Sequence, residues 1–271
     1  KIAHLIQQCG VPARHIVAVT FTNKAAREMR ERVGKLLPGD TGKGLQVSTF
    51  HTLGMRMLRR DAVTLGYKSN FSIFDSQDSL HLIDELLRKG GSAFASDALR
   101  NQISDWKNRL TLPKQAVQQA ATEFEQAAAL LYAEYQRSLK AYNALDFDDL
   151  ILQPVLALQD HDTVREHWQM RLRHMLVDEY QDTNAAQYRL VQLLVGKTKP
   201  CTVVGDDDQS IYAWRGANPE NLHRLKDDFP RLEIVKLEQN YRSAGCILKC
   251  ANQLIANNPH VIEKQLWSSL G

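Results

Sequence analysis

The sequence predicts an α/β fold in which a parallel sheet is interrupted by an all-helical insertion. Strands and amphipathic helices alternate over residues 11–60 and again over residues 172–257. Such alternation is typical of a parallel sheet with helical crossovers. Between the two stretches, residues 76–142 are helical in period and contain no strand-like run.

The first stretch contains two expected strands. Residues 16–21 are apolar and rich in β-branched side chains, and residues 45–49 follow the same pattern. Between them, apolar residues recur at three- and four-residue spacing from Thr22 until Pro38, which predicts an amphipathic helix. Its buried face should consist of Ala25, Met29, Val33 and Leu36. A second helix is expected from about Thr52.

The rest of the chain divides into helices and then strands again. Expected helices of the middle region cover residues 76–90, 97–110 and 114–142, separated by Gly90-Gly91, Pro113 and Asn143. Strands return at residues 172–177, 201–204 and 232–237. Amphipathic helices are expected at residues 185–195 and 244–257.

The composition is that of a globular protein. Hydrophobic residues make up 44% of the chain and charged residues 24%, and no apolar run approaches the ~18 residues of a membrane span. The net charge of +3 does not favour a nucleic-acid partner, so any such partner must be recognised by local sites. The 4 cysteines contain no CxxC pair, and without a signal peptide the protein is expected in a reducing cytoplasm.

Carboxylates directly follow two of the expected strands. Asp178 and Glu179 end one of them, and Asp206 ends the next, with Gln209 three residues later. One helix and one strand separate the two acidic ends, which is the length of a parallel crossover. Both ends should therefore face one crevice at the C-terminal edge of the sheet.

This pattern suggests a site that hydrolyses a nucleotide. Such a site needs oxygen ligands for Mg²⁺ and a group that orients and deprotonates water. Asp178 fits the metal ligand, Glu179 can reach the water, and Gln209 could sense a γ-phosphate. Alone, an Asp-Glu pair after a strand fits equally well a strand that exits into a polar turn.

Three polar segments are expected at the same edge of the sheet. Two of them place polar and aromatic groups at a helix N-terminus, where free N–H groups bind phosphate: Thr20, Phe21, Thr22, Asn23 and Lys24, then Ser48, Thr49, Phe50, His51 and Thr52. The third interleaves aromatic rings with a cation, on which bases stack whatever their sequence: Tyr212, Trp214 and Arg215. Each segment alone also fits a helix cap or a core aromatic, but their shared edge favours a shared ligand.

Tyr241 and Arg242 follow the last expected strand. Arg242 could place positive charge on a γ-phosphate, as an arginine finger does, and Tyr241 could stack on a purine. A surface salt bridge and a half-buried ring explain the two residues equally well from local sequence alone.

The chain carries no phosphate-binding loop. Gly196 begins a Gly-Lys-Thr ending, but Val191 stands where the first glycine is required, and a helix precedes the segment instead of a strand. Residues 39–44 are glycine-rich but have the wrong spacing. Both are expected to be turns. Because the chain starts inside an amphipathic helix without a cap, we expect a fragment of a longer protein.

Five segments in fixed order carry a family resemblance. They are residues 18–29 (AVTFTNKAAREM), 145–150 (LDFDDL), 177–184 (VDEYQDTN), 203–212 (VVGDDDQSIY) and 237–243 (LEQNYRS). In these segments the chain resembles the superfamily 1 DNA helicases of the Rep/UvrD/PcrA group. The resemblance extends over essentially the whole chain and is weakest from about residue 76 to residue 140.

The resemblance implies an ATP-dependent helicase that uses Mg²⁺ and moves 3′ to 5′ on single-stranded DNA toward duplex junctions. Asp178 resembles the Mg²⁺ ligand, Glu179 the catalytic base, and Gln209 the glutamine that couples phosphate state to the grip on DNA. Tyr241 resembles the tyrosine that stacks on adenine, and Arg242 the arginine on the γ-phosphate. The three polar segments resemble the motifs that contact single-stranded DNA.

The resemblance also implies a domain plan. RecA-like domain 1A is expected at residues 1–50 and 162–242, helical domain 1B at 51–161, and the start of domain 2A at 243–271. The phosphate loop would then precede Lys1, and the fragment alone should have negligible ATPase activity. Replication or repair proteins are the expected protein partners. Two alternatives stay open: the motor part of an ATP-dependent helicase–nuclease, and a non-hydrolysing module that binds single-stranded DNA.

Overall fold

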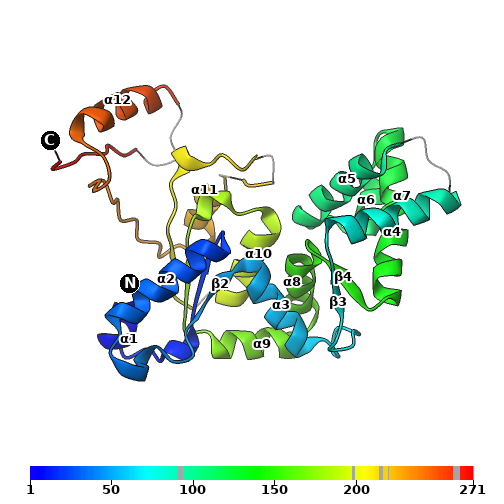
Figure 1. Cartoon of the computed structure of the whole chain (residues 1–271), viewed down its shortest axis with the longest axis horizontal. Helices are drawn as coiled ribbons and strands as arrows, with labels where there is room; N and C mark the ends of the chain where they lie inside the picture. The colour runs from blue at the N-terminus through cyan, green and yellow to red at the C-terminus, as the bar shows by residue number, and fades with distance from the viewer. Residues whose placement is uncertain (91–93, 197–198, 214–215, 219, 259–262, 271) are drawn as a thin grey trace.

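The computed structural model describes residues 1–90, 94–196, 199–213, 216–218, 220–258 and 263–270. These residues form a parallel sheet flanked by helices, a cluster of helices to one side of it, and a C-terminal segment whose helix α12 (Gly245–Ile255) lies apart from the sheet (Figure 1). The predicted α/β class is therefore confirmed. Over the described ranges, we find no helix with the length and apolar character needed to cross a membrane.

The central sheet has four strands in the order β2–β1–β5–β6, and every neighbouring pair is parallel. The strands are β1 (Ile16–Thr20), β2 (Gln46–Thr49), β5 (His174–Val177) and β6 (Cys201–Val203). All four coincide with strands predicted from the sequence. Because β5 and β6 are parallel neighbours, with Val177 beside Val203, the two acidic strand ends lie next to each other as expected.

Helices cover both faces of this sheet. Alternate residues of a strand point to opposite faces, and Val17 and Val19 lie in the larger core while Ala18 lies in a smaller one. The smaller core is closed by α1 (Ile2–Gln7) and α2 (Asn23–Leu36). The larger one is closed by α3 (Phe50–Asp61), α8 (Asp149–Asp160), α9 (Asp162–Arg171) and α10 (Ala185–Val195).

Helix α2 departs from its predicted buried face at one position. Val33 is buried, and Ala25 and Met29 are half-buried, as expected. The placement of Leu36 in the core is wrong, because its residue is 63% exposed. The helix ends at Leu36, and the next residue, Leu37, has extended backbone and is 7% exposed. Leu37, which follows the last turn of α2, therefore fills the core position predicted for Leu36.

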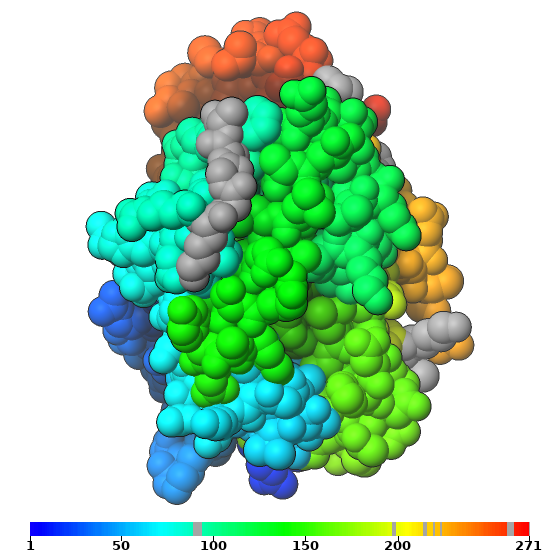
Figure 2. Space-filling model, turned by 90° about the vertical axis from the view of Figure 1, so that its right-hand side faces the viewer, coloured from blue at the N-terminus to red at the C-terminus, as the bar shows by residue number. Residues whose placement is uncertain are grey.

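The middle of the chain forms a separate helical cluster, which we call the helical lobe (residues 76–141; right-hand side of Figure 1, turned to face the viewer in Figure 2). Its helices are α4 (Ser76–Gly90), α5 (Ser96–Asn108), α6 (Pro113–Gln119) and α7 (Glu123–Ala141). The first two lie close to their predicted bounds, but the single helix predicted at residues 114–142 is wrong, because α6 ends at Gln119 and Thr122 caps the start of α7. They share a core of their own, which includes Ile83, Leu99 and Tyr132.

The region predicted as all-helical, residues 51–161, is not helical throughout. Two short parallel strands, β3 (Ser72–Phe74) and β4 (Ala144–Asp146), pair at the base of the helical lobe. They enter and leave the lobe side by side. Helices α3 and α8 pack closely against each other. A β-carbon added at Gly54 of α3 would clash with the carbonyl oxygen of Leu150 on α8.

The division of the chain into domains stays a prediction.

The strand predicted at residues 232–237 is wrong. This segment has no regular secondary structure, and Ile234, Val235 and Leu237 are exposed. Within the described part of the chain no strand lies beside it, so the segment has no partner for the backbone hydrogen bonds of a sheet. Helix α11 (Glu220–Asp228) precedes it, and α12 (Gly245–Ile255) follows near the predicted position.

Candidate functional site

The C-terminal ends of the four parallel strands meet at one edge of the sheet. Each of the predicted polar segments at residues 20–24, 48–52, 178–182 and 206–209 begins at such an end. In open α/β sheets this edge is where ligands bind. The sheet order therefore brings together segments that lie far apart in the sequence.

Asp178 directly follows β5 and contacts the end of the neighbouring strand β1. Its backbone N–H donates to the carbonyl oxygen of Val19 over 2.9 Å, and the Thr20 hydroxyl donates to Oδ2 of Asp178 over 3.4 Å. Burial raises the pKa of Asp178, and the neighbouring Glu179 carboxylate raises it further. A half-buried carboxylate beside a hydroxyl offers the oxygen ligands that Mg²⁺ prefers.

Glu179 has a backbone conformation that is rare for a residue with a side chain. Its φ of 53° and ψ of 47° lie in the left-handed region, which costs such a residue roughly 1–2 kcal/mol. The turn ends β5 abruptly and leads into the 3-10 turn η3 (Tyr180–Asp182), whose three residues are buried. Strained backbone of this kind is found at functional sites.

Gln181 joins the two acidic strand ends, a role that its sequence context does not predict. Its Nε2 donates to Oε2 of Glu179 over 2.8 Å, and its Oε1 accepts from the backbone N–H of Asp206 over 3.0 Å. Gly205 lies against this amide, because a β-carbon there would be 2.9 Å from Oε1 of Gln181. Only its place between two acids in a polar segment could have drawn attention to it.

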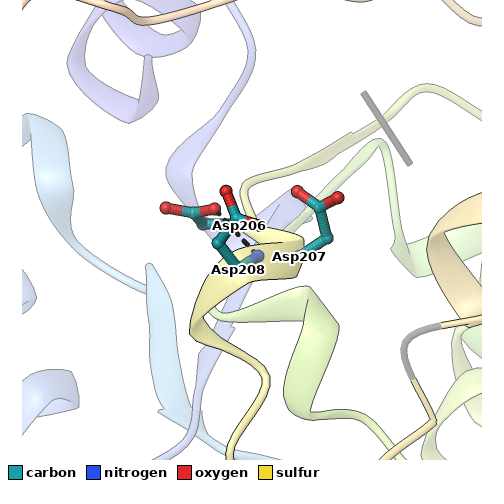
Figure 3. Close-up of side chains that lie close together, drawn as sticks. All are labelled: Asp206, Asp207 and Asp208. Atoms are coloured by element: carbon teal, nitrogen blue, oxygen red, sulfur yellow. Dashed lines mark hydrogen bonds between the residues drawn. The ribbon is translucent and has the colours of Figure 1, made fainter. Parts of the chain in front are cut away.

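The side chain of Asp206 stabilises the loop after β6 through hydrogen bonds within the loop. Oδ1 of Asp206 accepts from the backbone N–H of Asp208 over 3.2 Å, and Nε2 of Gln209 donates to Oδ2 of Asp206 over 2.6 Å. Carboxylate oxygens of Asp206, Asp207 and Asp208 all lie within 4.8 Å of one another (Figure 3). Gln209 is thus fixed relative to Asp206, next to the Glu179 loop.

Lys264 offsets part of the negative charge of this cluster of three aspartates. Its Nζ lies 2.6 Å from Asp207 and 3.0 Å from Asp208, and it also contacts Asp206. Burial acts to lower the pKa of Lys264, but its hydrogen bonds to the three carboxylates outweigh that effect and raise the pKa above its ordinary value. Lys264 also escapes the sequence analysis, since 56 or more residues separate it from its partners. With a cation already seated there, the cluster is a poorer Mg²⁺ site than Asp178.

The segments after β1 and β2 are helix starts. Thr22 caps α2 by accepting from the N–H of Ala25 over 3.1 Å, and Thr49 caps α3 by accepting from the N–H of Thr52 over 3.3 Å. Thr22 and Thr49 are therefore helix caps, which is the alternative that the sequence left open for these segments. Among the other members, Thr20, Ser48 and Phe50 are buried, and Asn23 and Lys24 are exposed.

Two aromatic pairs lie at this edge. Phe21 stacks on Tyr212 with ring centroids 5.2 Å apart, which joins the first and third predicted segments. His51 stacks on Phe147 at 4.0 Å, and burial lowers the pKa of His51 to about 4. Phe147 is 56% exposed and is a further aromatic that the sequence analysis does not propose. The predicted residues Trp214 and Arg215 lie outside the described residues.

Tyr241 and Arg242 lie on the exposed C-terminal segment. The Tyr241 hydroxyl donates to Oε1 of Gln239 over 2.7 Å, and the Arg242 N–H donates to Oδ1 of Asn240 over 2.8 Å. In the described part of the structure, no hydrogen bond joins either residue to Asp178, Glu179 or Gln209. The structure therefore brings the acids and Gln209 together, but not these two residues with them.

Comparisons with known proteins support the family resemblance. The family model described as the UvrD/REP helicase N-terminal domain matches residues 1–230. The chain is 58% identical to the ATP-dependent DNA helicase Rep of Salmonella typhimurium and 57% identical to that of Escherichia coli, over 100% of its length. It is 43% identical to the ATP-dependent DNA helicase PcrA of Staphylococcus aureus over 99% of its length. It spans 37% to 41% of the length of these relatives.

Proposed function

The chain belongs to the UvrD/REP helicase family, and we propose that it is part of an ATP-dependent DNA helicase that moves 3′ to 5′ on single-stranded DNA. In this proposal the chain contributes the acidic half of the ATPase site and one wall of the DNA path. The observation that carries it is the hydrogen-bonded contact between the Glu179 loop and the Gln209 loop at one edge of the sheet.

Hydrolysis needs a metal ligand and a base. Asp178 is the proposed Mg²⁺ ligand, with the Thr20 hydroxyl beside it as a further oxygen. When bound there, Mg²⁺ would neutralise charge on the phosphates of ATP. Glu179 is the proposed base, because its carboxylate lies next to Asp178 and can accept a proton from the attacking water.

Gln209 is the proposed link between the nucleotide and the DNA. It lies three residues before Tyr212 in the same loop, so a shift of the loop on loss of a γ-phosphate would reach the stacked pair of Tyr212 and Phe21. Aromatic rings of this kind stack on bases irrespective of sequence. Trp214, Arg215 and the segments at residues 20–24 and 48–51 complete the proposed path for single-stranded DNA.

Tyr241 and Arg242 are proposed to act from the opposite wall. Tyr241 is 76% exposed and can stack on adenine, and Arg242 can place positive charge on the γ-phosphate. Closure of the C-terminal segment onto the sheet would bring both residues to the nucleotide. The proposed domains are 1A at residues 1–50 and 162–242, 1B at residues 51–161, and the start of 2A at residues 243–271.

ATP hydrolysis in an extended chain tests this proposal. The chain would be extended to the length of its relatives with the flanking sequence of the Escherichia coli Rep helicase. We expect ATPase activity that depends on single-stranded DNA in the extended chain and negligible activity in the 271-residue chain. Glu179→Gln should lower kcat by about 10²- to 10⁴-fold, because the general base is lost.

A matched control is Glu166→Gln, which changes an exposed glutamate on α9 and should leave kcat unchanged. Turnover that survives Glu179→Gln would remove Glu179 as the base. Full activity in the 271-residue chain would show that the phosphates are held in another way than proposed.

A further inference from the structure

Gln181 is buried, polar and fully engaged between two loops of the site. It is 1% exposed, and its side-chain amide makes one hydrogen bond to each acidic strand end. We propose that Gln181 is a positioning residue for hydrolysis, whose amide fixes the Glu179 carboxylate and ties it to the loop that carries Gln209. This inference rests on the proposed function of the same site.

The orientation of the amide follows from its partners. The backbone N–H of Asp206 can only donate, so the oxygen of the Gln181 amide must face it. The NH₂ group then faces Glu179, where it can only donate, to Oε2. A reversed amide would place donor against donor and acceptor against carboxylate. Gln181 therefore fixes the position of the Glu179 carboxylate through a donated hydrogen bond.

Gly205 bounds the amide on one side. Gly205 lies so close that a β-carbon would be 2.9 Å from Oε1 and 3.4 Å from the backbone nitrogen of Gln181. The β-carbon of Tyr180 would be 3.4 Å from the same added atom. A long side chain such as Glu179 loses catalytic precision when it rotates freely, and a misplacement of 1 Å can cost about 10²-fold in rate.

The bridge also continues toward the γ-phosphate sensor. Asp206, whose N–H is bound by Gln181, accepts from Nε2 of Gln209 through its own carboxylate over 2.6 Å. Glu179, Gln181, Asp206 and Gln209 thus form one chain of contacts across two strand ends. A displacement of Gln209 would move the Asp206 loop, and through Gln181 it would move the base.

The first experiment tests the contact in the chain itself. The side-chain NH₂ signals of Gln181 are assigned in an ¹⁵N-correlated NMR spectrum by their loss in Gln181→Glu. We expect Glu179→Ala to shift these signals and to speed their exchange with solvent, because their acceptor is removed. Glu166→Ala on α9 should leave them in place. Signals that do not respond to Glu179→Ala would overturn the proposal.

The second experiment separates positioning from folding in the extended chain. Gln181→Leu removes both hydrogen bonds, and Gln181→Glu keeps the acceptor for Asp206 but repels Glu179. We expect both to lower kcat by about 10- to 100-fold, with KM for ATP and the affinity for single-stranded DNA within twofold. In a Glu179→Gln background, Gln181→Leu should cause no further loss of kcat, since no base is left to position.

Gln187→Leu is the matched structural control. Gln187 is 5% exposed and its side chain accepts from the N–H of Asn184 at the start of α10, so its loss should lower Tm while kcat stays within twofold. A kcat of Gln181→Leu within twofold of the parent would overturn the positioning role, as would an equal loss in both backgrounds. If the extended chain shows no ATPase activity, the proposed function fails, and the NMR result still decides whether Gln181 holds Glu179.

Discussion

Gly205 and Gln181 touch so closely that residue 205 has no room for a side chain: a β-carbon there would lie 2.9 Å from Oε1 of Gln181. Gly205→Ala should therefore displace the Gln181 amide and weaken its bond to Asp206. We expect kcat of the extended chain to fall by about tenfold, the lower end of the range expected for a misplaced group. A steady-state ATPase assay checks this. Gly34→Ala, where nothing lies within 4 Å of the added atom, is the control and should leave kcat unchanged.

The left-handed backbone of Glu179 predicts a difference between two substitutions. Glycine adopts this conformation without the cost that a β-carbon brings, roughly 1–2 kcal/mol. Glu179→Gly should therefore be more stable than Glu179→Ala by about 1 kcal/mol, although both remove the carboxylate. Urea unfolding of the two variants measures this difference. Equal stabilities would show that the left-handed turn relaxes when the carboxylate is lost.

His51 predicts a pH dependence of stability. Burial lowers its pKa to about 4 in the folded state, whereas an unfolded histidine titrates near 6.5. Its contribution is therefore complete above about pH 6.5 and is lost as the pH falls toward 4, because only the unfolded state takes up a proton in that window. The free energy of unfolding should fall by about 2 kcal/mol from this residue, a figure reduced for partial exposure.

His51→Phe isolates this contribution, because it keeps a ring on Phe147 and removes the titration. Burial also lowers the pKa values of His167 and His174, so the parent and the variant are compared at each pH. We expect the variant to lose less stability between pH 7.5 and pH 4.5. Parallel curves for the two proteins would contradict the placement of a neutral His51 in the folded state.

The stack of Tyr212 on Phe21 predicts an effect on DNA binding. Tyr212→Ala should weaken the binding of single-stranded oligonucleotides by about 1–3 kcal/mol, with no preference for base sequence. Fluorescence anisotropy with oligo-dT and a mixed sequence checks both parts. Ile211→Ala is the control, since Ile211 is 72% exposed beside it and carries no ring. A loss confined to one sequence would point to contacts with base edges instead of stacking.

Local sequence patterns predict correctly those helices and strands whose neighbours in the fold are also present. The strands of the central sheet carry unbroken β-branched runs, and the helices of the helical lobe have clear periods and punctuation. The apolar run at residues 232–237 looks the same but stays irregular, because a strand also needs a neighbour. The prediction that Leu36 is buried is wrong for a related reason. Helix α2 ends at Leu36, and the following residue, Leu37, enters the core instead.

The residues of the candidate site also differ in how far the sequence predicts them. The parallel topology alone places Asp178, Glu179 and Gln209 at one edge, so the sequence is sufficient for them. Gln181 and Lys264 matter through partners 25 and about 57 residues away, which no local spacing reveals. Contacts of this kind depend on the register of β5 and β6 and on the path of the C-terminal segment.

A buried ion cluster joins the helical lobe to β4 and to the start of α8. Lys107 of α5 is fully buried, and its Nζ lies 2.7 Å from Oδ2 of Asp146 and 3.0 Å from Oδ1 of Asp149. Burial acts to lower the pKa of Lys107, but the two carboxylates outweigh it and raise the pKa well above its ordinary value. Tyr135 adds a hydrogen bond from its hydroxyl to Asp146 over 3.0 Å. A single buried cation thus serves two buried carboxylates.

Lys107→Met should lower the free energy of unfolding by about 3–5 kcal/mol, because it leaves two carboxylates buried without their cation. The loss should be smaller in Lys107→Met/Asp149→Leu, since one of the two unpaired charges is then removed as well. Urea unfolding measures both variants, and hydrogen exchange should show the largest loss of protection in α5 and α7. Arg109→Met, which breaks an exposed pair with Asp105 on the same helix, should cost less than about 1 kcal/mol. If Lys107→Met costs no more than this control, the cluster does not hold the helical lobe to β4 and α8.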